Sequence, residues 1–244
     1  MNKIEILENL INRSKKIVVM TGAGFSKASG IPDFRSDDGL YNNEKQNINP
    51  EEILSHHFFI NRNKEFYDYY FSKMIYPKVL PNLAHRKLLE LEESGRLLNI
   101  ITQNIDGLHF LAGNKKVLEL HGSIHRNYCM KCNEKYTLSQ MLKLKDNPRC
   151  NKCGGLLKPD VVLYEEMLDE EVLDKSLESI KEADLLIIAG TSLVVAPASS
   201  LPYYFKGAHI VIVNLGPTPF DKYASLKIDD KVERVFQHIK IRKL

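Results

Sequence analysis

Four cysteines stand in two closely spaced pairs near the middle of the chain. Cys129 and Cys132 form one Cys-x2-Cys pair, Cys150 and Cys153 form the other, and 17 residues separate the pairs. This spacing is typical of four thiolates around one tetrahedral zinc ion. Two reactive or redox pairs are the alternative, but a redox pair sits at a strand-to-helix turn and these pairs do not. Because four sulfur ligands leave no position for a catalytic water, we expect one structural zinc.

The segment that carries the cysteines, residues 125–158, is also basic. It contains eight Lys or Arg against Glu134 and Asp146. A zinc ribbon that binds nucleic acid is one interpretation of this charge, and a solvated basic face is the other. We favour the solvated face, because no aromatic stacking platform accompanies the charge.

A glycine-rich turn follows the apolar run at residues 16–20. Gly22, Ala23 and Gly24 would let the backbone approach a pyrophosphate, with the N-terminus of a following helix aimed at it. Lys27 stands where the dinucleotide-binding fingerprint has its third glycine, and no acidic residue follows a second strand to hold a ribose. The turn therefore predicts phosphate binding but disfavours an ordinary dehydrogenase.

The residues after this turn combine an acid, an aromatic ring and a cation. Asp33, Phe34 and Arg35 stand directly behind Pro32 and lead into a polar loop. A merely structural turn would not explain Phe34 beside Arg35. We expect this segment to fold over a bound cofactor.

Polar residues also end the later apolar runs, where α/β sheets place their ligands. His121 follows one of these ends and is flanked by Gly122 and Ser123, which makes it a candidate base. We assign His85 and His109 to packing instead, because each lies next to a helical or turn segment. The residues at the strand ends are Gln103, Asn104, Ile105, Asp106, Gly190, Thr191, Ser192 and Asn214.

The elements that must position these side chains alternate along the chain. Short runs rich in Ile and Val are typical of buried parallel strands, and amphipathic stretches between them are typical of helices. We expect strands at residues 16–20, 98–102, 185–189 and 209–213. We expect helices at residues 2–13, 84–94, 169–182 and 229–239. The pattern predicts an α/β fold with a doubly wound, Rossmann-like parallel sheet.

Two stretches do not fit this alternation and are predicted as insertions. Residues 38–81, a cofactor loop followed by a helical insertion, are polar and then aromatic, and residues 125–158 form the zinc-ribbon insertion. Together they would make a smaller domain. The Rossmann-like domain would comprise residues 1–37, 82–124 and 159–244.

Composition sets the broad class. The chain has 244 residues, 43% of them hydrophobic, and a formal charge of +3, which is too close to neutral for a general nucleic-acid or membrane binder. The N-terminus mixes both charge signs and does not read as a targeting peptide. No apolar run reaches the roughly 18 residues of a membrane span. We therefore expect a cytoplasmic protein without a membrane partner.

Six ordered motifs resemble one family. GAGFSKASGIPDFR, TQNIDGLH, LHGS, the paired CxxC, GTSLVVAPAS and VNLG are similar to the sirtuins, the NAD-dependent protein deacylases, in the form of a bacterial-type minimal catalytic core. The resemblance covers essentially the whole chain. It implies NAD as co-substrate, a Rossmann-like NAD-binding domain, and removal of acetyl or longer aliphatic acyl groups from protein lysines to give nicotinamide and O-acyl-ADP-ribose.

The resemblance also implies roles for the cofactor residues. The turn at residues 22–24 would hold the pyrophosphate, and the loop at residues 33–35 would close over the nicotinamide ribose. Asp106, with the backbone of Ile105 and Ile31, would hold the nicotinamide carboxamide. The adenosine half would lie against Gly190, Thr191, Ser192 and Asn214.

The catalytic and peptide residues are implied in the same way. His121 would activate a ribose hydroxyl as general base, and Asn104, with Gln103, would position the ribose. The acyl-lysine peptide would pair as a strand with residues 161–163, Val-Val-Leu. In the family an aromatic-Gly-Glu turn usually follows, whereas this chain has Tyr164-Glu165-Glu166, which predicts extra negative charge at the groove edge.

Two other functions remain open at this point. A mono-ADP-ribosyltransferase would use the same cofactor, but it would not need a base for the ribose hydroxyl. A zinc-ribbon module that binds nucleic acid is an alternative of another class.

Overall fold

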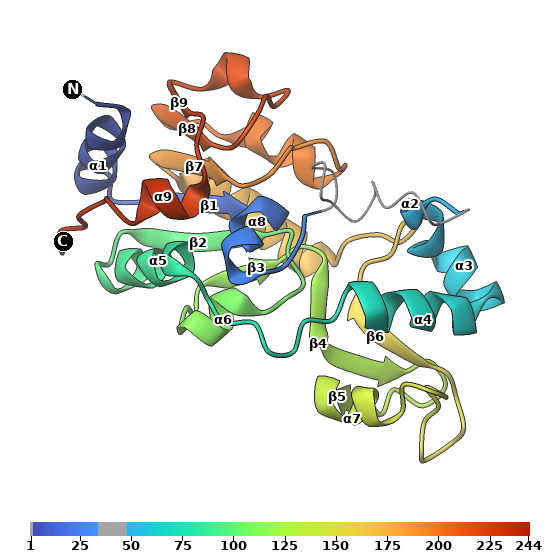
Figure 1. Ribbon diagram of the computed structural model, residues 1–244. Coiled ribbons are helices and arrows are strands. Elements are labelled where there is room, and N and C mark those ends of the chain that lie inside the picture. Colours follow the sequence, from blue (N-terminus) through green and yellow to red (C-terminus); the bar gives the residue numbers. More distant parts are fainter. Residues whose placement is uncertain (1, 34–47) are drawn as a thin grey trace.

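The computed structural model describes residues 2–33 and 48–244 and places a six-stranded parallel sheet at its centre (Figure 1). The strand order is β3-β2-β1-β7-β8-β9, and every neighbouring pair is parallel. The strands are β1 (Ile17–Thr21), β2 (Leu97–Thr102), β3 (Val117–Glu119), β7 (Leu185–Ala189), β8 (His209–Val213) and β9 (Leu226–Ile228). The order reverses direction between β1 and β7, and such a switch point is where doubly wound sheets bind their ligands.

The central strands are buried on both faces, which explains their continuous Ile and Val runs. All five residues of β1 are buried. Ile17 and Val19 join one apolar cluster, whereas Val18 and Met20 join another on the opposite face. This alternation follows the two-residue period of a strand.

Helices cover both faces of the sheet. The first cluster includes residues of α1 (Lys3–Arg13), α5 (Leu83–Glu93) and α9 (Val232–Phe236). The second includes residues of α8 (Glu170–Glu182) and of the 3₁₀ helix Ala198–Tyr204. Helix α6 (Leu108–Ala112) contacts α5. The predicted doubly wound α/β fold is confirmed.

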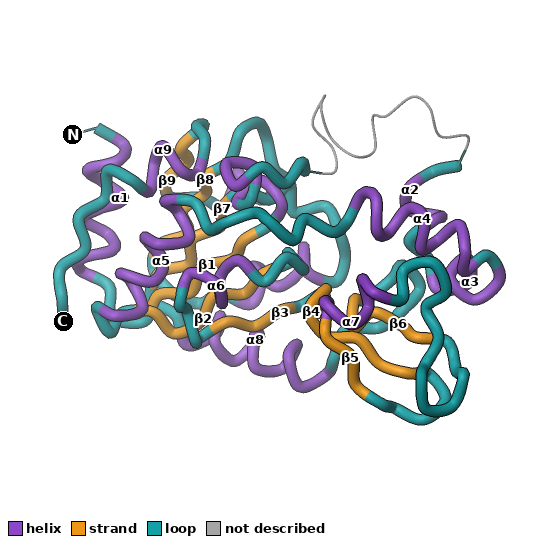
Figure 2. Tube along the Cα trace, turned by 60° about the horizontal axis from the view of Figure 1, so that its bottom comes forward, coloured by secondary structure: helices purple, strands orange, loops and turns teal. Residues whose placement is uncertain are grey.

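The smaller domain combines the two predicted insertions at the end of the molecule away from both termini (Figures 1 and 2). One part is helical: α2 (Pro50–Ile53), α3 (His56–Asn61) and α4 (Asn63–Lys73). The other part holds α7 (Leu138–Lys143) and an antiparallel sheet in the order β5-β4-β6, with β4 (Gly122–Cys129), β5 (Lys135–Thr137) and β6 (Leu157–Val161). Aromatic side chains of α4 and apolar side chains of this sheet share one core, and the Tyr67 hydroxyl donates a hydrogen bond to the Leu157 carbonyl.

Four elements differ from the sequence expectation. The edge strands β3 and β9 are only three residues long, too short for a periodicity to reveal them. The last helix spans only Val232–Phe236 instead of 229–239, since Lys231 is its N-cap and Asp229 accepts a hydrogen bond from the Gly216 backbone. The helix expected after the glycine turn is wrong: two short 3₁₀ turns, Ala23–Phe25 and Lys27–Ser29, take its place.

Within residues 2–33 and 48–244, the structure contains no helix that is long and apolar enough to cross a membrane.

Candidate active site

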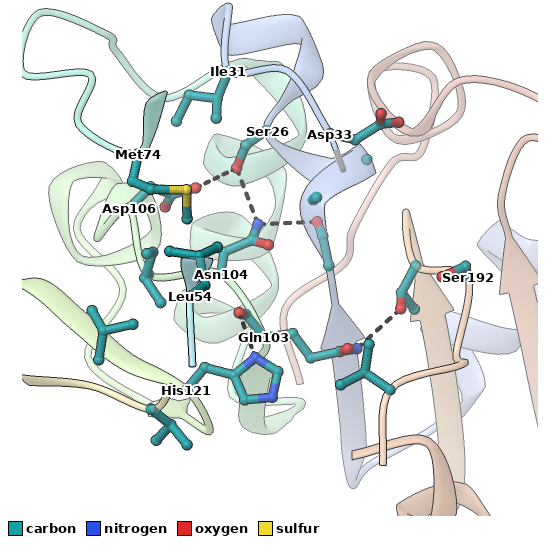
Figure 3. Close-up of a pocket in the computed structure, with 18 of the residues that line it drawn as sticks. Ser26, Ile31, Asp33, Leu54, Met74, Gln103, Asn104, Asp106, His121 and Ser192 are labelled. Atoms are coloured by element: carbon teal, nitrogen blue, oxygen red, sulfur yellow. Dashed lines mark hydrogen bonds between the residues drawn. The ribbon is translucent and has the colours of Figure 1, made fainter. Parts of the chain in front are cut away.

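A cavity of about 460 Å³ lies where the parallel sheet meets the smaller domain. Residues at the carboxyl ends of β1, β2, β7 and β8 line one side, and residues of α4 and of the segment after β6 line the other. Figure 3 shows polar side chains from several of these elements converging on this space. The position agrees with the switch point between β1 and β7.

The glycine turn after β1 is packed against the end of β7. Gly24 N–H donates to the Gly190 carbonyl at 2.8 Å. A Cβ atom on Gly22 would lie 2.7 Å from Thr191 Cβ, and one on Gly190 would lie 2.4 Å from Phe25 N. Glycine is therefore required by close backbone approach on both sides of the turn.

Asn104 and Asp106, after β2, are fixed by the same turn. Asn104 Nδ2 donates to the Gly22 carbonyl at 3.0 Å and to Ser26 Oγ at 3.1 Å, and Ser26 Oγ donates to Asp106 Oδ2 at 2.7 Å (Figure 3). Leu108 N–H donates to the other Asp106 oxygen at 2.8 Å. Burial raises the pKa of the Asp106 carboxyl, and these hydrogen bonds oppose the shift. The result is a rigid cluster of amide, hydroxyl and carboxyl groups on the cavity wall.

His121 has a defined tautomer because its Nδ1 atom lies 3.0 Å from the Gln103 carbonyl oxygen (Figure 3). A carbonyl only accepts hydrogen bonds, so Nδ1 carries the proton and Nε2 keeps a free lone pair. Burial lowers the pKa of His121, and the bond to the Gln103 carbonyl opposes the shift. The neutral ring, with Nε2 as the basic atom, is what a general base requires.

The residues predicted for the adenosine half come from neighbouring strand ends. Gln103 Nε2 donates to Thr191 Oγ1 at 3.0 Å, which links the end of β2 to the end of β7. Ser192 and Asn214 line the same side of the cavity. Asp33, on the loop after the glycine turn, forms an ion pair with Lys27 at 3.5 Å.

The cavity lining includes every predicted cofactor, catalytic and peptide residue that lies within the described ranges, although their individual roles stay predictions. These residues are Gly22, Ala23, Gly24, Ile31, Asp33, Gln103, Asn104, Ile105, Asp106, His121, Val161, Val162, Leu163, Gly190, Thr191, Ser192 and Asn214. Phe34 and Arg35 lie outside the described residues.

Sequence reasoning missed several residues of the cavity wall. Ser26 lies two residues after the glycine turn, and this position is the only signal for it in the sequence. Leu54, Tyr70 and Met74 line the cavity from the helical insertion, and Ile124 lines it from β4. Nothing in the sequence could indicate how this insertion turns toward the sheet.

The predicted peptide segment begins at the end of an edge strand. Among the strands that the structure describes, β6 is an edge of the order β5-β4-β6, and an edge presents backbone groups for a further strand. Val162 N–H donates to the His121 carbonyl at 3.0 Å, so the end of β6 is also tied to the candidate base.

The two carboxylates after this segment are paired. Glu165 has a left-handed backbone (φ 75°) and its carboxylate contacts His57 N–H at 3.0 Å and His57 Nδ1 at 2.9 Å. The Glu166 carboxylate contacts Lys158 Nζ at 2.9 Å and His56 Nδ1 at 2.8 Å. Lys158 compensates the charge of Glu166, whereas His57 can offset the charge of Glu165 only when it is protonated. The extra negative charge at the groove edge therefore stays a prediction.

The four cysteines fit one zinc ion. Their sulfur atoms all lie within 4.8 Å of one another. Sulfur atoms around a tetrahedral zinc lie about 3.8 Å apart, given Zn–S bonds of about 2.3 Å. Tyr136 donates its hydroxyl hydrogen to Cys150 Sγ at 3.2 Å and supports this ligand from outside.

Comparison with known proteins gives consistent matches. A family model described as the Sir2 family matches residues 22–197. An NAD-dependent protein deacetylase of Clostridium acetobutylicum is 49% identical over 242 residues, which cover 98% of both chains. One of Clostridium perfringens is 51% identical over 237 residues, which cover 96% of this chain and 97% of the relative.

Solved structures show the same similarity in three dimensions. A structure described as Sir2 with a p53 peptide and NAD⁺ has a TM-score of 0.87 and 41% identity, covering 98% of this chain and 97% of that one. A structure described as Sir2 bound to acetylated peptide has a TM-score of 0.86 and 38% identity, with the same coverage.

Proposed function

The chain belongs to the Sir2 family, and we propose that it is an NAD-dependent protein deacetylase. It removes acetyl groups from lysine side chains of proteins or peptides and yields nicotinamide and O-acyl-ADP-ribose. Relatives that are 49% and 51% identical over nearly their whole length carry the name of this activity. The cavity between the sheet and the smaller domain provides the space in which cofactor and acyl-lysine meet.

We propose that the strand ends hold NAD, which supplies the ribose carbon that loses nicotinamide and the hydroxyl that accepts the acyl group. The turn of Gly22, Ala23 and Gly24 faces the pyrophosphate. Asp106 and the backbone near Ile105 and Ile31 hold the carboxamide, and Asn104 and Gln103 hold the ribose next to it. The adenosine half is assigned to Gly190, Thr191, Ser192 and Asn214, with Asp33, Phe34 and Arg35 as the closing loop.

One observation carries the assignment of deacylation: His121 is held in the tautomer that leaves the lone pair on Nε2. The bond of Nδ1 to the Gln103 carbonyl fixes this tautomer. A base at this place removes the proton of a ribose hydroxyl, so that the hydroxyl oxygen can take over the acyl carbon. ADP-ribosyl transfer to a protein nucleophile would not need this step, and we therefore favour deacylation over it.

The basic zinc-ribbon segment does not support nucleic-acid binding as the main function. Arg126 pairs with Glu119 and Asp160. Two further cations are compensated, Lys152 by Glu134 and Lys158 by Glu166. Three of the eight basic side chains are thus engaged within the protein.

The remaining assignments follow from the same site. The acyl-lysine peptide would add to the edge strand β6 and the residues that follow it, Val161, Val162 and Leu163. Leu54, Tyr70 and Met74 would give the acyl group an apolar wall, which suits acetyl and longer aliphatic chains. We further propose the cytoplasm as the compartment, since four clustered thiols are zinc ligands there rather than disulfides.

The test is to incubate the protein with NAD and acetyl-lysine peptides and to identify the products by mass spectrometry. We expect deacylated peptide, nicotinamide and O-acetyl-ADP-ribose in equal amounts. ADP-ribose attached to protein without loss of the acetyl group would instead support the transferase. An affinity for DNA or RNA that falls steeply with salt concentration and does not change when NAD is added would support the nucleic-acid module.

A further inference from the structure

Two buried histidines lie behind the glycine turn, outside the cavity lining. His85 of α5 is 0% exposed and His109 of α6 is 2% exposed, and their ring centres are 4.8 Å apart. The Phe25 ring contacts both, with centre distances of 5.0 and 5.3 Å. In the described part of the chain, His85 Nε2 and His109 Nδ1 are buried without a hydrogen-bond partner. Buried polar atoms of this kind are rare and require a reason.

The neighbours of each ring define which nitrogen carries its proton. Asn82 N–H donates to His85 Nδ1 at 3.3 Å, so His85 carries its proton on Nε2. Thr21 Oγ1 donates to Thr102 Oγ1 at 2.9 Å and so accepts from His109 Nε2, which lies 3.0 Å away. His109 Nδ1 is then left with a lone pair. Within the described residues, each ring thus has one unpaired nitrogen, a donor on His85 and an acceptor on His109, and the ring centres lie 4.8 Å apart.

Charge does not interfere with this pairing. Burial lowers the pKa of His85 to about 3, and burial together with His85 lowers the pKa of His109 well below its ordinary value. Both rings are neutral at physiological pH. Since the torsion that turns a histidine ring has a broad minimum, the rings can rotate to bring Nε2–H of His85 toward Nδ1 of His109.

We propose that His85 and His109 are positioning residues for the cofactor site, joined by this hydrogen bond into a buried chain that fixes the glycine turn. At one end of the chain, Asn82 Nδ2 donates to the Phe25 carbonyl at 2.9 Å. At the other end, Thr102 Oγ1 accepts the Asn104 backbone N–H at 3.0 Å. The chain thus contacts the glycine turn at the Phe25 carbonyl and contacts Asn104, the residue proposed to bind the ribose, at its backbone N–H.

This inference rests on the proposed function only in naming NAD as the ligand that the turn positions. Neither histidine touches the cavity, so neither contacts the cofactor or the acyl group. Breaking the chain should loosen the turn and weaken NAD binding, while His121 and its bond to the Gln103 carbonyl stay in place. The effect belongs in the affinity for NAD rather than in the chemical step.

The first test reads the tautomers by nitrogen NMR of the ¹⁵N-labelled free protein. We expect His85 and His109 both to carry the proton on Nε2, and neither ring to titrate between about pH 5 and 8. A His109 ring protonated on Nδ1 would overturn the chain, because two donors would then face each other. This measurement uses neither NAD nor an acyl peptide, so it stands apart from the deacetylase assay.

The second test compares two changes at one position by calorimetric titration with NAD. His109→Phe keeps a ring against Phe25 but cannot bond Thr21, and we expect the Kd for NAD to rise by about tenfold, the usual effect of a lost buried hydrogen bond. His109→Gln, whose amide can still donate to Thr21, should recover most of this loss. In turnover, His109→Phe should raise KM for NAD and leave kcat within about twofold.

The control is Leu88→Ala, which opens a cavity beside α5, the helix of His85, and removes none of the polar groups of the chain. It should lower the melting temperature and leave the Kd for NAD unchanged. If Leu88→Ala weakens NAD binding as much as His109→Phe does, or if His109→Gln is no better than His109→Phe, the positioning role is wrong. Should His109→Phe fail to fold, the tautomer measurement on the unmodified protein still decides.

Discussion

At the scale of single residues, the environment of His121 determines its chemistry. The Gln103 carbonyl fixes the proton on Nδ1, and burial lowers the pKa of the ring. A base works only when it is neutral, and a histidine is neutral above its pKa. The lowered pKa therefore keeps His121 competent at a lower pH than a solvent-exposed histidine.

The direction of this pKa shift predicts the pH dependence of the reaction. The acidic limb of kcat/KM for an acetyl peptide, which reports the free enzyme, should lie below the ordinary histidine value of about 6.5. The measurement is a profile of initial rates from about pH 5 to 8. A limb above that value would mean that His121 is stabilised in its charged form and is not the base described here.

Removing the ring tests the same residue directly. His121→Ala should leave the Kd for NAD nearly unchanged and reduce deacetylation by at least about 100-fold, the usual effect of a lost general base. Calorimetry with NAD and mass spectrometry of the products separate the two properties. Unchanged turnover would refute the assignment. The exposed His238, in the turn after α9, provides the control His238→Ala, which should behave as the unmodified protein.

At the scale of elements, the turn after β6 departs from the usual aromatic-Gly-Glu sequence. Glu165 occupies a left-handed backbone conformation that costs a residue with a Cβ about 1 kcal/mol or more. Its contacts with His57 are exposed to solvent and offset only part of this cost. A glutamate therefore stands here although the backbone favours glycine.

This balance predicts an unusual order of stability at position 165. Glu165→Ala keeps the strained backbone and loses the contacts with His57, whereas Glu165→Gly loses the contacts and relieves the strain. Glycine should therefore be more stable than alanine by about 1 kcal/mol, the reverse of the order at ordinary positions. Urea unfolding of the two variants measures the difference. Alanine equal to or better than glycine would show that this backbone is not strained.

The zinc-ribbon element should depend on its metal. Cys153→Ala removes one of four ligands, so zinc should be released and the melting temperature should fall, because metal binding and folding are coupled. Elemental analysis and thermal unfolding measure these effects. The control Ser139→Ala changes an exposed side chain of the same module and should keep one zinc per chain. A Cys153→Ala protein with no zinc and an unchanged melting temperature would contradict a structural role.

The limits of sequence reasoning also appear at this scale. The four long strands and the paired cysteines could be predicted, because Ile and Val runs and Cys-x2-Cys spacing are local patterns. The edge strands β3 and β9 could not, since three residues carry no period. His121 could be named from its flanking Gly-Ser, whereas Tyr70 and Met74 reach the cavity only through the packing of α4 on the zinc-ribbon sheet.

At the scale of the whole molecule, the two insertions act as one body against the parallel sheet. Aromatic residues of α4 and apolar residues of the zinc-ribbon sheet form a single core, with Phe66 stacked on Tyr70 at 5.7 Å. This joint body supplies the apolar wall of the cavity, while the sheet supplies the polar wall. Loss of zinc should therefore affect acyl binding through α4, even though the cysteines do not line the cavity.

The same arrangement predicts how acyl chain length affects the reaction. Each buried methylene adds about 0.8 kcal/mol, or roughly a fourfold gain in kcat/KM, if it lies against the wall of Leu54, Tyr70 and Met74. The cavity of about 460 Å³ must also accept NAD, so the gain should stop after a few methylenes. We expect kcat/KM to rise from acetyl to butyryl and to rise no further at myristoyl.

Met74→Trp, which fills part of this wall, should reduce butyryl removal more than acetyl removal. Rates measured on one peptide sequence with each acyl group test this, and equal rates for acetyl and butyryl in both proteins would mean that the wall serves only as the core of the smaller domain.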